Sequence, residues 1–348
     1  WNLLSPTGTL SFIQSNKFIR SNYGRKLRKL LAESQAVNSI VDFGALQIFE
    51  SVTNYICILF LNRAGNRNCK YIKVNNFDEW KISPSNSLQS IVPSANITEK
   101  EWNFAVGDGA GLFNRLNNLS LRLGDVADIF VGLQTSADDV FILKTVKKNK
   151  NILQLMSKSL AKEWIFERDL LFPLVSGTDV IRYMPLPERQ LILFPYVIYN
   201  NEAKLINFDE ISRNYPKTAN YFNENKNRLE MRENGRMKGL NWYGYIYHKN
   251  MTRQSVKKIC VPRLVDKLYA TYDQEGKHFL DNVDVNGITL KPDFQKLGIY
   301  FILGLLNSSL FRWYFPFVSA PFRGGWLSAN KQFLSQLPIA IDNGNREK

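Results

Sequence analysis

The order of apolar and polar residues in the first 61 positions predicts a strand, a helix and two further strands. Apolar and polar residues alternate over Thr9–Gln14, as in a strand covered on one face. Over Ser21–Ala32 apolar residues recur every three or four positions, which is typical of an amphipathic helix. Val37–Phe43 predicts a second strand, and the apolar run within Asn54–Leu61 predicts a third strand that is buried on both faces. This order predicts half of a layered α/β domain, which we place in residues 1–80.

The remainder of the chain has a less regular pattern, which predicts a mixed α+β domain over residues 111–343. A stretch rich in serine, proline and asparagine within residues 81–110 is expected to connect the two domains, and residues 344–348 are expected to form a tail. The other expected elements are an edge strand at Lys70–Val74, a helix at Gly111–Leu121, a strand pair at Asp128–Val131 and Val140–Leu143, a polar helical region at Ile206–Leu240, short strands from Trp242 onward, a buried helix at Leu297–Tyr314 and a closing segment at Asn330–Leu337.

Charge adds information about partners. The 348 residues include 45 Lys+Arg against 31 Asp+Glu, a formal net charge of +14, which favours an anionic partner such as nucleic acid. Residues 213–268 hold thirteen Lys/Arg, four Asp/Glu and seven aromatic residues, so most of the excess lies there. Interleaved cations and aromatics suit a surface that neutralises phosphates and stacks on bases. The alternative is a solvated helix face beside an aromatic core. The residues predicted to contact phosphates are Arg232, Arg236, Lys238 and Arg253, and those predicted to lie near the bases are Trp242 and Tyr243.

Other classes of function are disfavoured by what the sequence lacks. Its most apolar stretch, Leu297–Leu306, has ten residues, about half of what a membrane-spanning helix needs. The three cysteines, Cys57, Cys69 and Cys260, have no metal-binding spacing, and the chain has only two histidines, so a zinc site or a histidine relay is not expected. We expect a cytoplasmic monomer that binds double-stranded DNA and no membrane.

Two short motifs have the spacing of functional sites. Val106–Gly111 is glycine-rich and precedes the expected helix, as in a phosphate- or nucleotide-binding loop. A lone glycine loop is weak evidence for such a site, so the favoured interpretation is a loop that only leads into a helix. Asp273–Lys277 has the acid-x-Lys spacing with which nucleases hold a metal ion, whereas a charged hairpin turn is the simpler interpretation. By its chemistry alone, the sequence contains no complete active site.

The first 62 residues resemble the later motifs of N6-adenine DNA methyltransferases. The match consists of SPTGTLSFIQSNKFIRSNYGRKLRKLL and IVDFGALQIFESVTNYICILFL, in the order and spacing of that family. The downstream chain is similar to the TaqI-like specificity domain, the target-recognition part of Type IIG restriction-modification enzymes. The residues that carry this second resemblance are Leu123–Asp125, Val131–Phe141, Pro173–Val180, Leu229–Arg236, Asn241–Tyr243, Leu305–Leu310 and Leu337–Ile339.

The resemblance implies a partial Rossmann-like methyltransferase half (β-α-β-β) followed by a mixed α+β target-recognition domain. It implies that Phe49 stacks on an adenine flipped out of the duplex, because a base that has left its stack needs another apolar face; packing of Phe49 under the next strand is the alternative. The family's glycine strand and Asn-Pro-Pro-Tyr loop are absent from this sequence, so we expect them in a missing N-terminal methyltransferase portion before Trp1. S-adenosylmethionine would be the cofactor of the full-length protein, and we expect none bound to this fragment. A stand-alone specificity subunit and a nuclease remain as alternatives.

Overall fold

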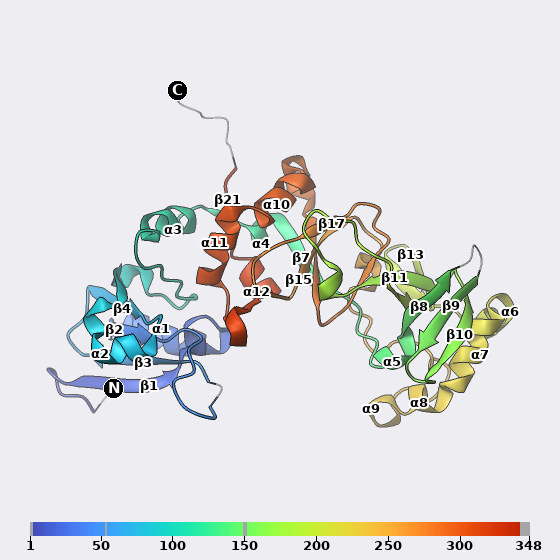
Figure 1. Cartoon of the computed structure of the whole chain (residues 1–348), viewed down its shortest axis with the longest axis horizontal. Helices are drawn as coiled ribbons and strands as arrows, with labels where there is room; N and C mark the ends of the chain where they lie inside the picture. The colour runs from blue at the N-terminus through green and yellow to red at the C-terminus, as the bar shows by residue number, and fades with distance from the viewer. Residues whose placement is uncertain (1–2, 53, 149–151, 342–348) are drawn as a thin grey trace.

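The computed structural model describes residues 3–52, 54–148 and 152–341. Figure 1 shows an elongated arch in which the N-terminal lobe and a far lobe are joined by a middle part. The first lobe is formed by the N-terminal sheet, the far lobe mainly by residues between about 132 and 257 together with residues 279–280, and the middle part by the segments before and after residues 132–257. Each part has a hydrophobic core of its own, and two smaller apolar clusters accompany them.

The N-terminal lobe is a five-stranded sheet with the order β1-β3-β2-β4-β5. Strand β3 is antiparallel to both β1 and β2, and helix α1 connects β1 to β2. The predicted strand, helix, strand, strand order is therefore confirmed, with a short 3-10 turn at Asn22–Gly24 before α1. The elements are β1 (Thr9–Ser15), α1 (Arg25–Glu33), β2 (Val37–Asp42), β3 (Ile56–Asn62), β4 (Asn68–Lys73), α2 (Phe77–Ile82) and β5 (Leu88–Pro93).

Two predictions at the end of this lobe are corrected. Strand β4 is not at the edge, because it pairs with β2 on one side and β5 on the other. Residues 81–110 are not simply a connection, because they contain β5, and Trp102 and Phe104 belong to the core of the lobe. Only Val92 of β5 is buried, and its apolar residues Leu88, Ile91 and Val92 do not alternate with polar ones, so the strand cannot be recognised from its pattern.

The middle part combines a four-stranded sheet, β17-β15-β19-β7, with helices from residues 110–126 and 299–334. The single helix expected at Leu297–Tyr314 is two helices, α10 and α11. Between them the Asn307 side chain bonds the backbone of Ala270, and Ser308 Oγ accepts the Phe311 N–H at 3.1 Å and caps α11. The elements are α3 (Ala110–Asn117), β6 (Leu121–Arg122), α4 (Leu123–Val126), β7 (Ala127–Val131), β15 (Lys258–Pro262), β16 (Leu264–Val265), β17 (Thr271–Asp273), β19 (Val285–Leu290), α10 (Ile299–Leu306), α11 (Ser309–Val318), β20 (Leu327–Ser328), α12 (Lys331–Leu334) and β21 (Pro338–Ile339).

The far lobe contains a six-stranded sheet, β10-β9-β8-β12-β11-β18, beside a group of short helices. The helical prediction for residues 206–240 is confirmed. The strand pair expected at residues 128–131 and 140–143 is wrong, because β7 and β8 lie in different sheets and Val140 belongs to a helical turn. The elements are α5 (Asp138–Phe141), β8 (Ile142–Lys148), β9 (Ile152–Ser157), β10 (Lys162–Glu167), β11 (Leu171–Val175), β12 (Gln190–Leu193), β13 (Tyr196–Tyr199), β14 (Glu202–Leu205), α6 (Phe208–Asn214), α7 (Pro216–Glu224), α8 (Lys226–Glu230), α9 (Arg232–Gly235) and β18 (Phe279–Leu280).

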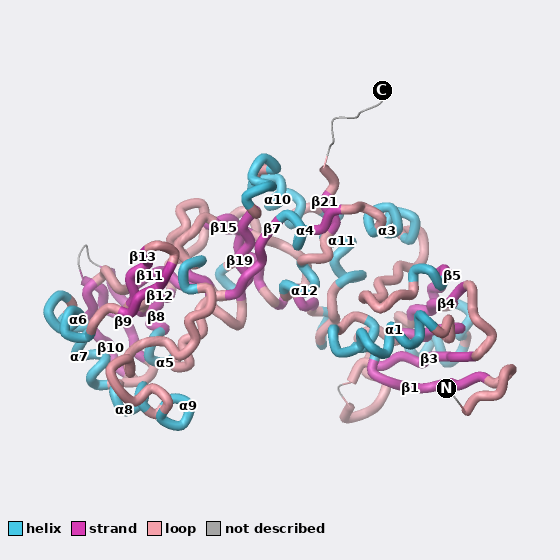
Figure 2. Tube along the Cα trace, turned by 180° about the vertical axis from the view of Figure 1, so that it is seen from behind, coloured by secondary structure: helices cyan, strands magenta, loops and turns pink. Residues whose placement is uncertain are grey.

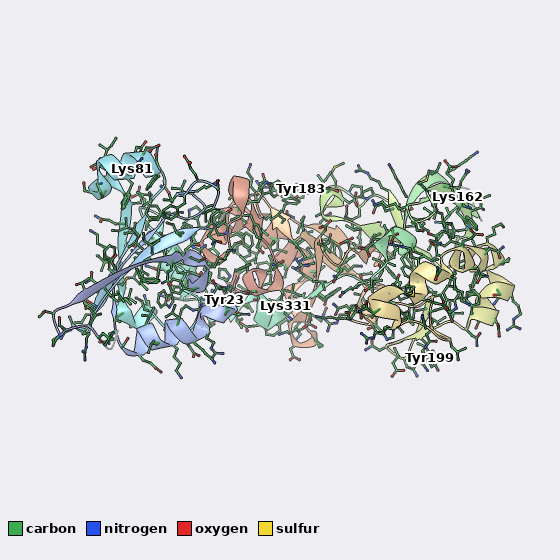
Figure 3. The ribbon with its side chains drawn as sticks, turned by 90° about the horizontal axis from the view of Figure 1, so that it is seen from below. Tyr23, Lys81, Lys162, Tyr183, Tyr199 and Lys331 are labelled. Carbon is green, nitrogen blue, oxygen red and sulfur yellow. The ribbon has the colours of Figure 1, made fainter. Side chains whose placement is uncertain are left out.

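The arch has an inner side, at the bottom of Figure 1. Helices α5, α8 and α9 lie there on the far lobe, and the loop after β2 hangs there from the N-terminal lobe; Figure 2 shows the same arrangement from behind. Strands β13 and β14 are on the opposite side of the far lobe. Seen from below in Figure 3, Lys81 and Lys162 lie toward opposite ends of the molecule, with Lys331 of α12 between them. None of the helices in the described part of the chain has the length and hydropathy needed to span a membrane.

Candidate nucleic-acid interface

Three of the six residues predicted to contact DNA lie in the core of the far lobe. Trp242 and Tyr243 are buried and pack against each other and against Phe208 and Phe222. The Tyr243 hydroxyl donates to the Ile206 carbonyl at 2.6 Å. The prediction that these two rings face bases is therefore corrected: they form the aromatic core that was named as the alternative.

Arg232 is also buried, with only 7% of its surface exposed, which corrects its predicted contact with phosphate. Its guanidinium donates to four backbone carbonyls: Leu229 at 2.9 Å, Thr135 at 3.1 Å, Trp242 at 2.7 Å and Gly244 at 2.8 Å. No carboxylate of the described residues forms an ion pair with it. Burial lowers its pKa to about 10, which still leaves it charged at neutral pH. Arg232 therefore fixes three segments to one another and keeps a positive charge below the surface.

The other three predicted cations are exposed. Arg236 Nη1 lies 2.9 Å from Glu233 Oε2, and Arg253 Nη2 lies 3.3 Å from Asp128 Oδ2. These are surface pairs, which contribute little to stability and are readily exchanged for another anion. Lys238 is exposed in the loop after α9. The structure thus leaves Arg236, Lys238 and Arg253 available to a ligand, while their contact with phosphate stays a prediction.

A turn at Gly132–Asp139, which we call the 132–139 turn, leads into α5 on the inner side and is held by several close contacts. A Cβ on Gly132 would lie 1.7 Å from the Leu280 carbonyl oxygen, so only glycine fits there. The Leu133 N–H bonds that same oxygen, and Thr135 Oγ1 donates to Asp138. Gln134, Ser136 and Asp138 are exposed, and Ser136 has a left-handed φ of 57°.

The sequence analysis did not predict this turn as part of a binding site. Val131–Phe141 served there only as one of the segments that resemble the TaqI-like specificity domain. The residue types themselves were a usable signal, because threonine and aspartate side chains often bond neighbouring groups in turns, as Thr135 does with the Ala137 N–H and with Asp138. Nothing in the sequence indicated that Arg232, 97 positions away, bonds the Thr135 carbonyl.

The other end of the arch carries Phe49, in the loop between β2 and β3. Phe49 is 46% exposed, so the structure does not place it under the following strand. The loop begins at Asp42, a buried carboxylate that accepts from Asn16 Nδ2 at 2.8 Å, the Gly44 N–H at 2.9 Å and the Tyr71 hydroxyl at 2.8 Å. These bonds fix the start of the loop.

A cavity of about 560 Å³ lies beside this network, between the N-terminal lobe and the end of α11. Its polar side includes Asn16, Lys17, Asp42 and Lys73, and Pro316 and Phe317 contribute to its apolar side. Burial lowers the pKa of Lys73. No local pattern indicated this cavity, because its walls come from segments as far apart in the chain as Asn16 and Pro316.

Asp273–Lys277, the segment with nuclease-like spacing, has a structural role, because its aspartate is paired in the protein interior. Asp273 is buried; its Oδ2 accepts from Lys258 Nζ at 2.8 Å and from the His278 N–H at 3.0 Å. Burial alone would raise the pKa of Asp273, but hydrogen bonds from His278 and the charge of Lys258 outweigh it and lower the pKa to about 2. The motif is not a hairpin turn either, because β17 and β18 belong to different sheets. The carboxylate is thus occupied by Lys258 and His278, and the described residues contain no group of three His, Cys, Asp or Glu that could hold a metal ion.

The remaining motifs have structural roles. In the glycine loop, the Gly107 carbonyl accepts the Ala110 N–H at 3.0 Å at the start of α3, as expected for a loop that leads into a helix. The three cysteines are buried, and burial raises the pKa of each thiol to about 12. A thiol with such a pKa is not ionised at neutral pH, so these cysteines are not nucleophiles.

Two segments of the chain match the sequence profiles of known protein families. Residues 198–339 match the sequence profile of the TaqI-like C-terminal specificity domain, and residues 1–49 match that of the Eco57I restriction-modification methylase. These matches confirm the resemblance inferred from the sequence, to the C-terminal part of a restriction-modification methyltransferase.

Full-length relatives extend the similarity over nearly the whole chain. Type II restriction enzyme and methyltransferase RM.Eco57I of Escherichia coli is 23% identical over 361 residues, which covers 97% of this chain and 35% of that protein. Type II methyltransferase M.BanIII of Aneurinibacillus aneurinilyticus is 25% identical over 342 residues, covering 88% of this chain and 56% of that protein. The chain therefore spans between about a third and about half of the length of these relatives.

A solved structure shares the fold. It is that of the Type IIL restriction-modification enzyme MmeI in complex with DNA, with a TM-score of 0.56 and 11% identity over 97% of this chain and 40% of that one. The mixed architecture of sheets and helices thus recurs in a restriction-modification enzyme.

Proposed function

We propose that this chain is the DNA-recognition part of a Type IIG restriction-modification N6-adenine DNA methyltransferase, and that duplex DNA binds on the inner side of the arch. The match of residues 198–339 to a specificity domain carries the proposal. Exposed Arg236 and Lys238 lie directly after α9, on the inner side, where they can neutralise phosphates. Phosphate contacts of this kind position a duplex, and base-edge contacts then select the sequence.

The N-terminal lobe supports a methyltransferase rather than a stand-alone specificity subunit. We propose that β1-β3-β2 with α1 is the second half of a Rossmann-like methyltransferase sheet. Strand β1 forms one edge of the sheet, and its Phe12 and Ile13 are more than half exposed. An edge strand with large exposed apolar side chains favours pairing with a further strand. A methyltransferase with the rest of its sheet beyond β1 would provide that strand.

Phe49 is the residue that we propose stacks on the flipped adenine. It is exposed, it lies in the loop that Asp42 fixes, and that loop is on the inner side of the arch. A flipped base loses its stacking partners, and a half-exposed aromatic ring supplies an apolar face in return. The chain would thus hold the duplex and receive the extruded base.

S-adenosylmethionine would supply the methyl group in the whole enzyme. In the glycine-rich loop Val106–Gly111, a Cβ on Gly109 would lie 2.6 Å from the Trp313 ring, so this part of the loop packs against α11. No step of the proposal passes through the cofactor.

DNA binding by the chain tests this proposal. The logarithm of the affinity for a duplex should fall linearly with the logarithm of the salt concentration, with about 0.9 counterion released per neutralised phosphate. The double variant Arg236→Glu/Lys238→Glu should lower that slope by about two and weaken binding to all sequences alike.

The control is Lys81→Glu/Lys162→Glu, which changes the net charge equally at the two ends of the molecule. It should leave the slope near that of the unaltered chain. Equal slopes and affinities in the two double variants would show that α9 does not face DNA. No duplex binding by the unaltered chain at low salt would refute the proposed function itself.

A further inference from the structure

Two hollows adjoin the 132–139 turn, one on each side, and both are lined by Ser136, Ala137 and Arg228. The first has a volume of about 570 Å³ and also includes Asn225, Asn227 and Arg232; we call it the basic hollow. The second has a volume of about 540 Å³ and includes Asp138, Asp139 and Asp281; we call it the acidic hollow. The two hollows thus share three residues of their lining and differ in the charges of the others.

The charge of the basic hollow comes from a cation that is not neutralised. Arg232 lies at its wall, and its four hydrogen bonds go to carbonyls, which orient the guanidinium without cancelling its charge. Arg228 also lines the hollow but is paired with Asp139, so Arg232 is the cation without a carboxylate partner among the described residues, and Glu224 is the single acid among the lining residues. A charge held below the surface in a medium of low dielectric acts more strongly on a nearby anion than a solvated charge does.

The surface of the basic hollow provides donors for that anion. Ser136 and Asn227 are exposed, with a hydroxyl and an amide that can donate. Arg228 Nη2 lies 2.7 Å from Asp139 Oδ2, which holds its guanidinium at the boundary between the two hollows. Hydroxyl, amide and guanidinium donors are the usual side-chain ligands of DNA phosphates.

The acidic hollow cannot take the same anion. Its three aspartates outnumber its one cation, Arg228. Burial is the largest influence on Asp281 and raises the pKa of that carboxyl, and the charges of Asp284 and Asp138 also raise it. A phosphate is therefore admitted on only one side of the 132–139 turn.

We propose that the basic hollow, formed by Ser136, Asn227 and Arg228 over the buried Arg232, binds one backbone phosphate of duplex DNA. The inference rests on the proposed function and adds a specific anchor to it. Such an anchor fixes the orientation of the duplex on the inner side of the arch and contributes no sequence preference. Arg232 is a positioning residue here, because it holds the Thr135 carbonyl and thereby the turn that bears Ser136.

Two substitutions of one residue separate charge from shape. Asparagine and aspartate both tolerate the left-handed φ of Ser136, and they differ in charge but hardly in volume. Ser136→Asn should bind duplex DNA within about twofold of the unaltered chain, whereas Ser136→Asp should bind at least about tenfold more weakly, since like charges brought together are strongly unfavourable. The loss should be equal for unrelated duplex sequences, and the salt slope should fall by about one.

Asn201→Asp is the matched control. Asn201 is exposed, has a φ of 60°, lies in the turn between β13 and β14, and lines neither hollow. It should bind like the unaltered chain. If Ser136→Asp binds as Ser136→Asn does while the unaltered chain binds DNA, the anchor is refuted and the proposed function stands. If the loss depends on sequence, the turn reads bases and the phosphate assignment is wrong. If the unaltered chain binds no duplex, both proposals fail.

Discussion

Arg232 shows how a single buried charge can act as a structural tie. Replacing it with leucine would leave four carbonyl acceptors without their donor in the interior, at a cost of about 3 kcal/mol of unfolding free energy. The exposed Arg236, four positions later, is the control, and Arg236→Leu should change the unfolding free energy by about 0.5 kcal/mol or less. Urea denaturation of both variants measures this difference. Similar values for the two would contradict the structural role of Arg232.

Asp273 makes stability depend on acid pH. Its pKa is about 2 in the folded protein, below the ordinary 3.8, so its contribution is complete above about pH 4 and is lost as the pH falls through about 2. About 1 kcal/mol should disappear between pH 6 and pH 3. Asp273→Asn lacks the contribution of this carboxylate to the unfolding free energy at every pH. The unfolding free energies of the variant and the unaltered chain should therefore approach each other as the pH falls. Denaturant titrations at both pH values test this; a constant difference would refute it.

Phe49 should matter for chemistry and little for folding. Because it is 46% exposed, Phe49→Ala should change the unfolding free energy by about 0.5 kcal/mol or less. In the methyltransferase that contains this chain, the same change should slow adenine methylation more than it weakens DNA binding, since the stacking face is lost only to the extruded base. Methylation rates and duplex affinities, measured on the same preparations of the variant and the unaltered enzyme, test whether methylation is affected more than binding. A large loss of stability would instead make Phe49 a core residue.

At the scale of elements, β1 is the exposed edge of the first sheet. Phe12 is 56% exposed, so Phe12→Lys should leave the unfolding free energy within about 0.5 kcal/mol of the original. A lysine on an edge strand hinders pairing with another strand, so any self-association of the chain at high concentration should decrease. Sedimentation velocity over a concentration series measures that change. Stronger association of the variant would show that β1 is not the edge through which chains meet.

At the scale of the whole molecule, Arg20 joins the N-terminal lobe to the middle part. Its Nη1 donates to the Ser319 carbonyl at 2.5 Å, and its own carbonyl accepts from Gln332 Nε2 at 2.8 Å. Arg20→Ala should loosen this junction and increase the radius of gyration in small-angle scattering. Arg25→Ala removes an ion pair with Glu99 within the lobe and should leave that radius unchanged. An unchanged radius in Arg20→Ala would show that other contacts hold the junction.

The sequence by itself determined the features that depend on local periodicity and on composition. The elements from Thr9 to Leu61 followed from apolar spacing, because the period of apolar residues reflects the geometry of the strand or helix itself. The polar helices of residues 206–240 likewise followed from the local sequence pattern. The excess of cations in that region followed from composition. The family resemblance also needed only the order of short motifs along the chain.

Tertiary structure decided which of these residues are available to a ligand. Arg232, Trp242 and Tyr243 look like surface residues in a basic segment, but carbonyls and rings from distant segments enclose them. Strand β5 and the break between α10 and α11 depend on partners elsewhere: β4 for the first, and the backbone of Ala270 for the second. The two hollows exist only where the 132–139 turn, α8 and the Asp281 segment meet. Burial is a property of contacts between segments far apart in the chain, so a local pattern could predict the elements and the sign of the charge but not the site they form.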